Sequence, residues 1–191
     1  DVADVPDGWC EDTIVLLCPV FGEVGPGLAR AARGVVTGVS LQGWLRSCDD
    51  QQRIVGTTDV GFLDHLAGVD VLLYSDEDVA HEPALEAAFY AVAPVAVRTH
   101  GPCGATVFTR EHTERVPGLD VAEIDPTGAG DTFAGAFLTH FARNKDPFAA
   151  AHFGCRVAAL EVSHHGPLTP ALLRDHGYAT WDDLPGGREG S

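Results

Sequence analysis

Residues 123–133 read EIDPTGAGDTF, which places small residues and a carboxylate between a short apolar run and an amphipathic helix. The apolar run, residues 121–124, is predicted to be a strand that ends in a turn. After the turn, Phe133, Phe137 and Phe141 recur every four residues, which is the stripe of an amphipathic helix. The helix is therefore predicted to begin near residues 128–131, at one β-to-α connection of an α/β fold.

The start of this helix has the chemistry of an anion site beside a base. The first backbone N–H groups of a helix lack partners within it and carry the positive end of its dipole. Gly128, Ala129 and Gly130 lack bulk, so a negatively charged oxygen can approach those groups. Asp131 lies in the first turn, where it can face the same anion, and this arrangement suits base-assisted phosphoryl transfer. The alternative is that Asp131 only caps the helix and the glycines only form the turn.

The pattern Asp125-x-Thr127-Gly-Ala-Gly-Asp131 resembles the C-terminal signature of the PfkB/ribokinase family of carbohydrate kinases. The resemblance implies that the amides of residues 128–130 form an anion hole for the transferred phosphate. It implies that Asp131 contacts the acceptor and takes the proton from its hydroxyl. It also allows K⁺ beside the backbone of Asp125 and Thr127.

A second segment, residues 95–105, is similar to the family's strand and Thr-x-Gly-x-x-Gly turn near the nucleotide. The resemblance makes Thr99, Gly101, Gly104 and Thr127 candidates for contacts with ATP, whose phosphates Mg²⁺ would bridge.

Three further positions follow from weaker likenesses. Ser75 and Asp78 stand where the family usually carries Asn-x-x-Glu, so Asp78 joins Asp125 as a candidate metal ligand, with a solvated helix start as the alternative. Residues 17–24 and 40–46 are similar to the branch that contains myo-inositol kinases. There Gln42 can donate to and accept from a polyol, with a turn amide as the alternative. Arg46 offers a fork for phosphate oxygens, but we expect it to form a surface ion pair.

The remaining pattern fits an α/β domain. Predicted strands at residues 13–17, 35–40, 69–74 and 95–99 alternate with helical stretches such as residues 83–92. An antiparallel addition is expected at residues 105–109, and Asp146-Pro147 is expected to open a second long helix. The resemblance implies a ribokinase-like three-layer α/β/α sandwich with a mostly parallel sheet.

Length and composition suggest a part of a larger protein. The 191 residues contain no methionine, and the family's sugar-contacting signature and β-lid lie N-terminal to the matched regions. We therefore expect residues 1–176 to be the C-terminal portion of one kinase domain, without the N-terminal part that includes the lid, and residues 177–191 to be a loose tail. A homodimer formed through the lid would use that missing part.

Charge and cysteine usage limit the partners. The net charge of −16 argues against nucleic acid and anionic membranes, which leaves small sugars, polyols or nucleosides. The single lysine, Lys145, does not follow a Walker glycine loop, so P-loop chemistry is excluded. Five scattered cysteines without a Cys-x-x-Cys pair indicate reduced thiols in a cytoplasmic protein.

These observations predict an ATP-dependent kinase that phosphorylates a hydroxyl of a sugar or polyol, with Asp131 as general base. Two alternatives remain open. One is a nucleoside kinase of the same family, and the other is a non-catalytic remnant that keeps the fold and the nucleotide pocket.

Overall fold

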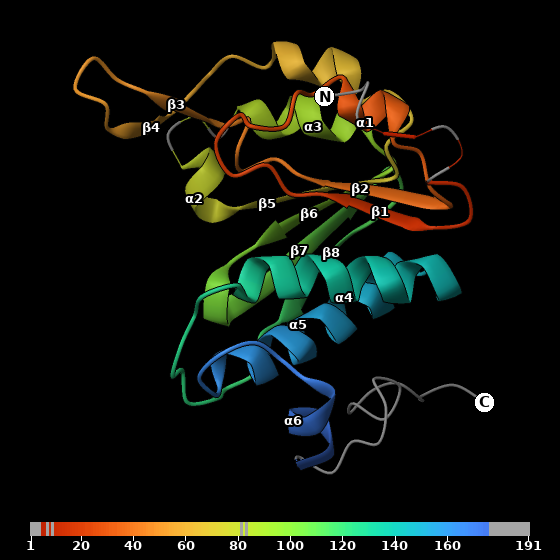
Figure 1. Ribbon diagram of the computed structural model, residues 1–191, viewed down its shortest axis with the longest axis vertical. Helices are drawn as coiled ribbons and strands as arrows, with labels where there is room; N and C mark the ends of the chain where they lie inside the picture. Colours follow the sequence, from red (N-terminus) through yellow and green to blue (C-terminus); the bar gives the residue numbers. More distant parts are fainter. Residues whose placement is uncertain (1–4, 7, 9, 81, 83, 176–191) are drawn as a thin grey trace. The chain divides into compact units, whose positions relative to one another are not determined.

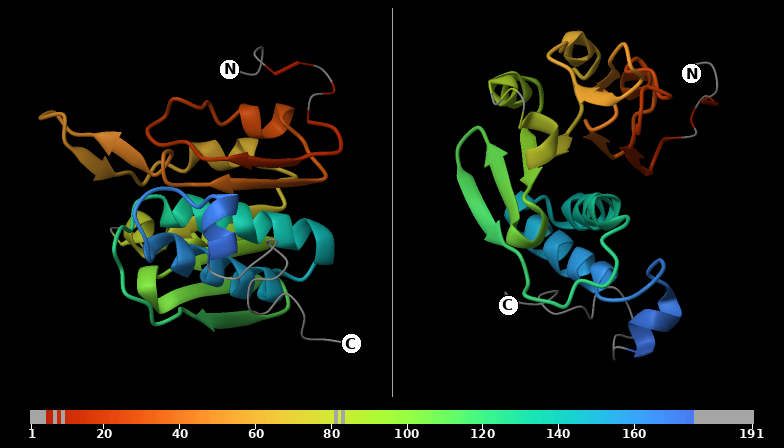
Figure 2. Two further views of the ribbon diagram at one scale, coloured as in Figure 1. Left: turned by 60° about the horizontal axis from the view of Figure 1, so that its bottom comes forward. Right: turned by 90° about the vertical axis from the view of Figure 1, so that its left-hand side faces the viewer.

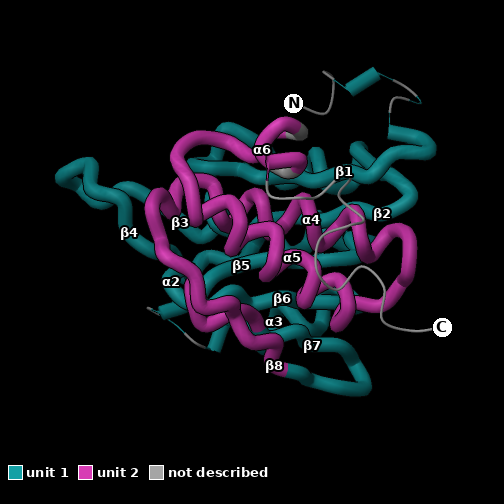
Figure 3. The backbone as a smooth tube through the Cα atoms, turned by 90° about the horizontal axis from the view of Figure 1, so that it is seen from below, with its two compact units in different colours: residues 1–100, 106–114 teal, residues 101–105, 115–191 magenta. Residues whose placement is uncertain are grey.

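The computed structural model describes residues 5–6, 8, 10–80, 82 and 84–175, so the predicted tail from residue 177 lies outside the described residues. The chain divides into two compact units (Figure 3). Unit 1 comprises residues 1–100 and 106–114, and unit 2 comprises residues 101–105 and 115–191. The assignment of residues 1–176 to one domain stays a prediction.

Four parallel strands form the main part of the sheet: β1 (Ile14–Leu17), β2 (Val36–Ser40), β5 (Val71–Ser75) and β6 (Val95–Thr99) (Figure 1). Each pairs with the next in parallel, and the full strand order is β1-β2-β5-β6-β7-β8. All four predicted strands are therefore confirmed, with bounds that differ by at most two residues. The strands β2, β5 and β6 are mostly buried, as is typical of parallel strands covered on both faces, whereas β1 at the edge of the sheet is partly exposed.

Helices of unit 1 pack their apolar sides into its core. These are α1 (Leu28–Ala31), the 3₁₀ helix η2 (Gly61–His65), α2 (Asp76–Val79) and α3 (Leu85–Val92). Phe89 of α3 is fully buried and meets Tyr74 of β5 edge-on at 5.1 Å between ring centroids. Such aromatic pairs contribute beyond their buried area, so α3 is fixed against the strand that carries Tyr74.

Two antiparallel features accompany the parallel strands. The expected addition is β7 (Gly104–Thr109), which is followed by β8 (Thr113–Pro117). A tight turn joins the two strands, and in it the Thr109 N–H donates to the His112 carbonyl. A hairpin of β3 (Arg46–Cys48) and β4 (Ile54–Gly56) was not predicted. It extends away from the parallel strands of the same unit (Figure 2).

Unit 2 contains two long helices, α4 (Ala129–Asn144) and α5 (Pro147–Val162), with the 3₁₀ helix η3 (Gly101–Cys103) and the short α6 (Pro170–Asp175). The start of α5 is as predicted. Asp146 is its N-cap and accepts hydrogen bonds from the N–H groups of Phe148 and Ala149, while Pro147 takes the first helical position.

The strand predicted at residues 121–124 is wrong, because these residues have irregular backbone in the structure. The Ile124 N–H donates to the carbonyl of Val162, at the end of α5, rather than to a neighbouring strand. The apolar side chain of Ile124 is also 49% exposed. A helix end, not a sheet, therefore holds the segment that leads into α4.

Candidate functional site

The start of α4 has the geometry that the sequence predicts for an anion site. Gly128 is the N-cap residue and has a φ of 82°, a left-handed conformation that residues with a β-carbon rarely adopt. No side chain caps this helix end. Asp131 is the third helical residue and is exposed, and the structure gives its carboxylate no partner in the described part of the chain. Asp131 therefore makes no capping hydrogen bond with the described residues, whereas Gly128 does form the turn, as the alternative expects.

Some backbone N–H groups at the start of α4 already have an acceptor and others do not. The Ala129 N–H donates to the Pro126 carbonyl at 3.2 Å, and the Thr132 N–H donates to the Gly128 carbonyl at 2.9 Å. Within the described residues, no acceptor is found for the N–H groups of Gly128, Gly130 and Asp131. A β-carbon added to Gly130 would meet no atom within 4 Å. Free donors, open space and a free carboxylate therefore occur together, as an anion site requires.

A short turn supports the entry to α4. The Thr127 N–H donates to Asp125 Oδ1 at 3.0 Å. This hydrogen bond lowers the pKa of the Asp125 carboxyl below its ordinary value. Asp125 N–H also bonds to the Val162 carbonyl at 3.2 Å. Asp125 thus fixes the backbone next to the predicted anion hole, and its role as a metal ligand stays a prediction.

Glu161 of α5 was not predicted and lies beside this turn. Its side chain is buried, and its Oε2 accepts the Leu168 N–H at 3.0 Å. A β-carbon placed on Gly128 would lie 3.7 Å from Glu161 Oε1. A single acidic residue in the apolar stretch 157–162 was the signal that could have revealed it.

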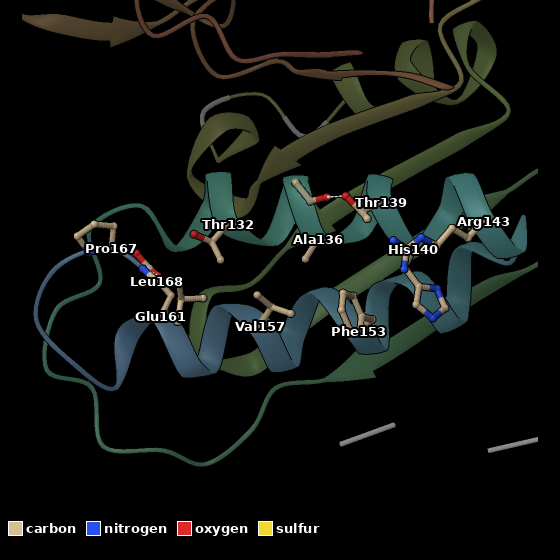
Figure 4. Close-up of a pocket in the computed structure, with 11 residues that line it drawn as sticks. Thr132, Ala136, Thr139, His140, Arg143, Phe153, Val157, Glu161, Pro167 and Leu168 are labelled. Carbon is tan, nitrogen blue, oxygen red and sulfur yellow. Dashed lines mark hydrogen bonds between the residues drawn. The ribbon is translucent and has the colours of Figure 1, made fainter. Parts of the chain in front are cut away.

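A cavity of about 400 Å³ lies between α4 and α5, and Glu161 is at one end of it (Figure 4). His140 of α4 and Phe153 of α5 stack at 5.1 Å between ring centroids and contribute to its wall. Thr132 lines the cavity, but Asp131 does not. The cavity is thus a neighbour of the predicted anion hole and not part of it.

The nucleotide-contact candidates near β6 differ in their contacts with the rest of the protein. Thr99 Oγ1 donates to the Tyr74 carbonyl at 3.4 Å. Gly101 has a φ of 55° and open space where a β-carbon would be, as expected for a turn residue near a ligand. A β-carbon on Gly104 would lie 2.2 Å from the Val116 carbonyl oxygen. Close backbone approach therefore explains Gly104 without any nucleotide.

A chain of ion pairs and hydrogen bonds connects the ends of β5 and β6, and the sequence analysis did not anticipate it. His100, which lies between Thr99 and Gly101 in sequence, bonds through Nδ1 to Asp76 Oδ2 and through Nε2 to Thr106 Oγ1, both at 2.7 Å. Asp76 also pairs with Arg98, 3.2 Å from its Nε.

The chain continues from Arg98, which binds both carboxylate oxygens of Glu86. Tyr74 donates its hydroxyl to the same carboxylate at 2.8 Å. Burial, together with the hydrogen bonds to Tyr90 and Glu86, raises the pKa of Tyr74 above its ordinary value. The turn after β6 is therefore tied by side chains to α2, α3 and β5.

Asp78 is held at the start of α2 through its backbone N–H and one of its carboxylate oxygens. Its Oδ2 accepts the Ser75 N–H at 2.7 Å and the Ser75 hydroxyl at 2.8 Å. The Asp78 N–H in turn donates to Ser75 Oγ, which completes a capping box. The side chain is buried, so the alternative of a helix start is confirmed, although without the expected solvation. A metal role for Asp78 stays a prediction.

The two segments with a likeness to inositol kinases lie side by side in unit 1. A β-carbon on Gly43 would come within 2.4 Å of the Pro19 backbone, so the turn after β2 contacts the segment after β1 directly. Gln42 is half-buried in this turn. Arg46, at the start of β3, forms no ion pair with any described residue, so the expected surface ion pair is not found.

The candidate residues divide between the two units. Gln42, Asp78 and Thr99 belong to unit 1, whereas Gly101, Gly104 and residues 125–131 belong to unit 2. Among the described residues, no group of three or more His, Cys, Asp or Glu side chains is placed to hold a metal ion. The described helices are also each too short or too polar to cross a membrane.

A search of curated proteins finds a relative that shares part of this chain. The chain is 33% identical over 123 residues to an ATP-dependent ribose-1-phosphate kinase of Halopiger xanaduensis, an alignment that covers 61% of this chain and 40% of the relative. The chain thus spans less than half of that relative's length.

Solved structures share the fold. A pyrophosphate-dependent kinase in the ribokinase family superposes with a TM-score of 0.73 at 20% identity, over 91% of this chain and 63% of that one. The ribokinase of Thermotoga maritima gives a TM-score of 0.68 at 18% identity, over 92% and 60%. The ribokinase-like α/β fold with a mostly parallel sheet is therefore confirmed.

The sequence profile of the pfkB family carbohydrate kinases matches residues 66–173, a range that contains β5, β6, α4 and α5 and therefore both the Thr99 turn and the Asp131 helix start. The match extends over more than half of the chain, and the protein belongs to the pfkB family of carbohydrate kinases.

Proposed function

We propose that the protein is an ATP-dependent kinase that phosphorylates a hydroxyl group of a sugar or polyol, with Asp131 as general base and the helix-start amides as anion hole. The observation that carries this proposal is the free Asp131 carboxylate next to free backbone N–H groups at the start of α4. A carboxylate that caps a helix or forms an ion pair would be less available to accept a proton.

In this proposal Asp131 accepts the proton of the acceptor hydroxyl while the hydroxyl oxygen bonds to the γ-phosphorus of ATP. The bond between that phosphorus and the β,γ-bridging oxygen breaks, and ADP leaves. The N–H groups of Gly128 and Gly130 donate to the phosphoryl oxygens, where negative charge must be held in place. The Ala129 N–H contributes less, because it is already donated to Pro126. Asp125 and Thr127 keep this backbone in position through their mutual hydrogen bond.

Mg²⁺, when bound, would neutralise charge on the donor phosphates. Asp125 and Asp78 are the acidic candidates for this ion. Since Asp78 Oδ2 already accepts two hydrogen bonds, only its other oxygen is left for an ion or for a metal-bound water. K⁺ near the backbone of Asp125 and Thr127 would hold the same turn.

The acceptor is proposed only as a class. The curated relative is called a ribose-1-phosphate kinase, and two solved neighbours are a complex of a pyrophosphate-dependent kinase with myo-inositol and a nucleoside kinase with inosine. Ribose, ribose 1-phosphate, fructose, myo-inositol and nucleosides therefore form the panel. Small polar molecules fit the strong negative charge of the chain better than nucleic acid does.

The test measures ADP release from Mg-ATP by the full-length protein with each acceptor, and phosphate transfer from pyrophosphate as a second donor. Acceptor-dependent turnover that falls by about 10²- to 10⁴-fold in Asp131→Asn would support the proposal, since this is the usual loss for a general base. Asp120→Asn is the control, because Asp120 is also an exposed carboxylate of unit 2.

Retention of near-normal turnover by Asp131→Asn would remove Asp131 from the mechanism. Nucleotide binding without turnover on any acceptor would favour the non-catalytic alternative. Turnover with nucleosides alone would favour the nucleoside kinase.

A further inference from the structure

The side chain of His100 is held from two sides within unit 1, and no step of the proposed reaction uses it. Its Nδ1 lies 2.7 Å from Asp76 Oδ2, and its Nε2 lies 2.7 Å from Thr106 Oγ1. Only 7% of the side chain is exposed. We call Asp76, His100 and Thr106 the histidine bridge. A buried polar network whose members have their partners is rigid, so the bridge restrains the backbone that carries it.

The partners of His100 fix the direction of both hydrogen bonds. A carboxylate only accepts hydrogen bonds, so Nδ1 donates to Asp76. In the neutral ring Nε2 is then the acceptor, and the Thr106 hydroxyl donates to it. Asp76 is held in turn, because its Oδ1 lies 3.2 Å from Nε of Arg98. The ring is therefore oriented by a carboxylate that is itself restrained.

The bridge joins the two ends of the turn after β6. His100 directly follows the last residue of β6, and Thr106 is the third residue of β7. The bond between their side chains therefore closes the chain around residues 101–105. Gly101 and Gly104, within this range, have φ values of 55° and 94°. Because glycine has access to many backbone conformations, a contact that fixes both ends of the turn limits which of them it adopts.

The same bridge connects this turn to the end of β5. Ser75 and Thr99 are the last residues of β5 and β6, and they are partners in the parallel register. One position further along the chain from each of them, Asp76 and His100 meet through their side chains. Ligands of open α/β sheets bind beyond the carboxyl ends of the strands. The bridge therefore lies at the edge of the sheet where a ligand is expected.

Thr99 depends on this backbone because its own side chain is weakly held. Its hydroxyl donates to the Tyr74 carbonyl at 3.4 Å, which is a long distance for such a bond. The place of the hydroxyl is thus set mainly by the backbone of residues 99 and 100. Gly101 has no side chain, so the backbone alone places its N–H and carbonyl groups. A displaced His100 would therefore move both of these candidates for contact with ATP.

We propose that His100 is a positioning residue for the nucleotide, which acts through Thr99 and Gly101 and does not touch the reacting atoms. The inference rests on the proposed function, in which the turn after β6 contacts ATP. It adds the device that sets the turn: Asp76 orients the His100 ring, and the ring holds Thr106 across the turn. Loss of the bridge should therefore weaken nucleotide binding and leave the chemical step unchanged.

The experiment measures the Kd of ADP by calorimetry, in the full-length protein and in variants of the bridge. His100→Ala removes both hydrogen bonds and should weaken ADP binding by about tenfold or more. Thr106→Val removes one hydroxyl at nearly constant shape and should weaken binding by about two- to tenfold, the range of a single hydrogen bond. Thr106→Ser restores the hydroxyl and should bind ADP nearly as the unmodified protein does.

Two amide variants identify the contact that holds the turn. The amide of His100→Gln can take the place of Nε2 and reach Thr106, whereas the amide of His100→Asn can replace only Nδ1, beside Asp76. We expect His100→Gln to keep more of the affinity for ADP than His100→Asn. The reverse order would overturn the role given to Thr106.

Matched controls lie in the turn between β7 and β8. Thr109 Oγ1 donates to the His112 carbonyl at 2.9 Å, so Thr109→Val also removes a bonded hydroxyl from β7. The side chain of His112 is 62% exposed, and His112→Ala removes a histidine outside the bridge. Both controls should bind ADP with unchanged affinity, and thermal unfolding without ligand checks that every variant is folded. Equal loss of affinity in Thr109→Val and Thr106→Val would overturn the proposal.

Steady-state kinetics separates positioning from catalysis. In Thr106→Val the KM for ATP should rise together with the Kd of ADP. The kcat at saturating ATP and the KM for the acceptor should stay within about twofold, which is the pattern of lost uniform binding. A lower kcat at an unchanged KM for ATP would overturn the proposal, and so would an unchanged Kd of ADP in both His100→Ala and Thr106→Val.

This proposal and the kinase proposal fail in different ways. ADP binding that weakens in the bridge variants of a protein that turns over no acceptor would support the bridge and contradict the kinase. Turnover with unchanged ADP affinity in the bridge variants would support the kinase alone. Absence of ADP and ATP binding in the unmodified protein would overturn both.

Discussion

Helices α2 and α4 both carry an aspartate at their third residue, but the two side chains differ in burial and in hydrogen bonding. In α2 the N-cap is Ser75, whose backbone is extended, and Asp78 folds back to accept its N–H and hydroxyl. In α4 the N-cap is Gly128, which has a left-handed backbone and no side chain, and Asp131 is exposed and has no partner among the residues that the structure describes. The residue three positions earlier thus separates a structural carboxylate from one available for chemistry.

The donors at the two helix starts differ in the same way. Ser75 Oγ accepts the Asp78 N–H and thereby satisfies one of the free donors of α2. At α4, the N–H groups of Gly128, Gly130 and Asp131 have no acceptor within the described residues. A helix start that lacks a capping side chain keeps its donors for a ligand.

The largest expected difference comes from removing each aspartate. Asp131→Ala should reduce turnover by about 10²- to 10⁴-fold, while its free energy of unfolding changes by no more than about 0.5 kcal/mol, as for other surface substitutions. Asp78→Ala should lower the free energy of unfolding by about 1–3 kcal/mol, because the partly buried Ser75 N–H loses its acceptor. Steady-state kinetics and denaturant unfolding of both variants test this.

An inverted result would break the comparison. If Asp131→Ala unfolded much more easily and Asp78→Ala did not, the exposed carboxylate would be the structural one.

A methyl group at the α4 N-cap is the next test. Gly128→Ala should cost about 1–2 kcal/mol of stability, the usual penalty for a left-handed residue with a β-carbon. Gly130→Ala is the matched control, because Gly130 is helical and has open space around it. It should gain about 0.5–1 kcal/mol in the absence of ligand, but lose affinity for the phosphate donor, since the methyl group occupies the space for the anion.

Thermal unfolding with and without nucleotide measures both variants. Unimpaired donor binding in Gly130→Ala would argue against an anion hole at this helix start.

The capping serine of α2 should show a smaller effect. Ser75→Ala removes the side-chain acceptor for the Asp78 N–H and should cost about 1 kcal/mol. Ser75→Thr keeps a hydroxyl and should cost less. Denaturant unfolding of the two variants decides, and equal stability of Ser75→Ala and the unmodified protein would show that the capping box contributes nothing.

The smallest effect concerns Asp125, next to the α4 start. The Thr127 N–H lowers its pKa in the folded protein, so this carboxyl should titrate below about 3.9, the value of an unperturbed aspartate. Its contribution to stability is then present above that pH and is lost as the pH falls through the folded-state pKa. Carboxyl-carbon NMR measures the titration, and a midpoint at or above the unperturbed value would contradict the observed turn.

Local patterns predicted the parallel strands, β7 and the longer helices α3, α4 and α5. The four parallel strands and the starts of α4 and α5 follow from apolar runs, from the four-residue spacing of phenylalanines and from Asp146-Pro147. The apolar run at residues 121–124 was wrongly predicted to be a strand, because a short apolar segment is also compatible with irregular backbone held at a helix end. The β3–β4 hairpin was missed because Arg46, Ser47 and Cys48 show no alternation of apolar and polar residues.

The sequence by itself determined the fold class and predicted a candidate anion site at the α4 start, because the residues concerned are neighbours whose turn and helix geometry is local. Only the tertiary structure decided which charged groups are already satisfied. Asp76 with His100, Arg98 with Glu86, and Glu161 beside Gly128 meet across 12 to 33 positions of sequence, whereas no described residue forms an ion pair with Arg46. Such pairings depend on strand order and helix packing, which a local pattern does not contain.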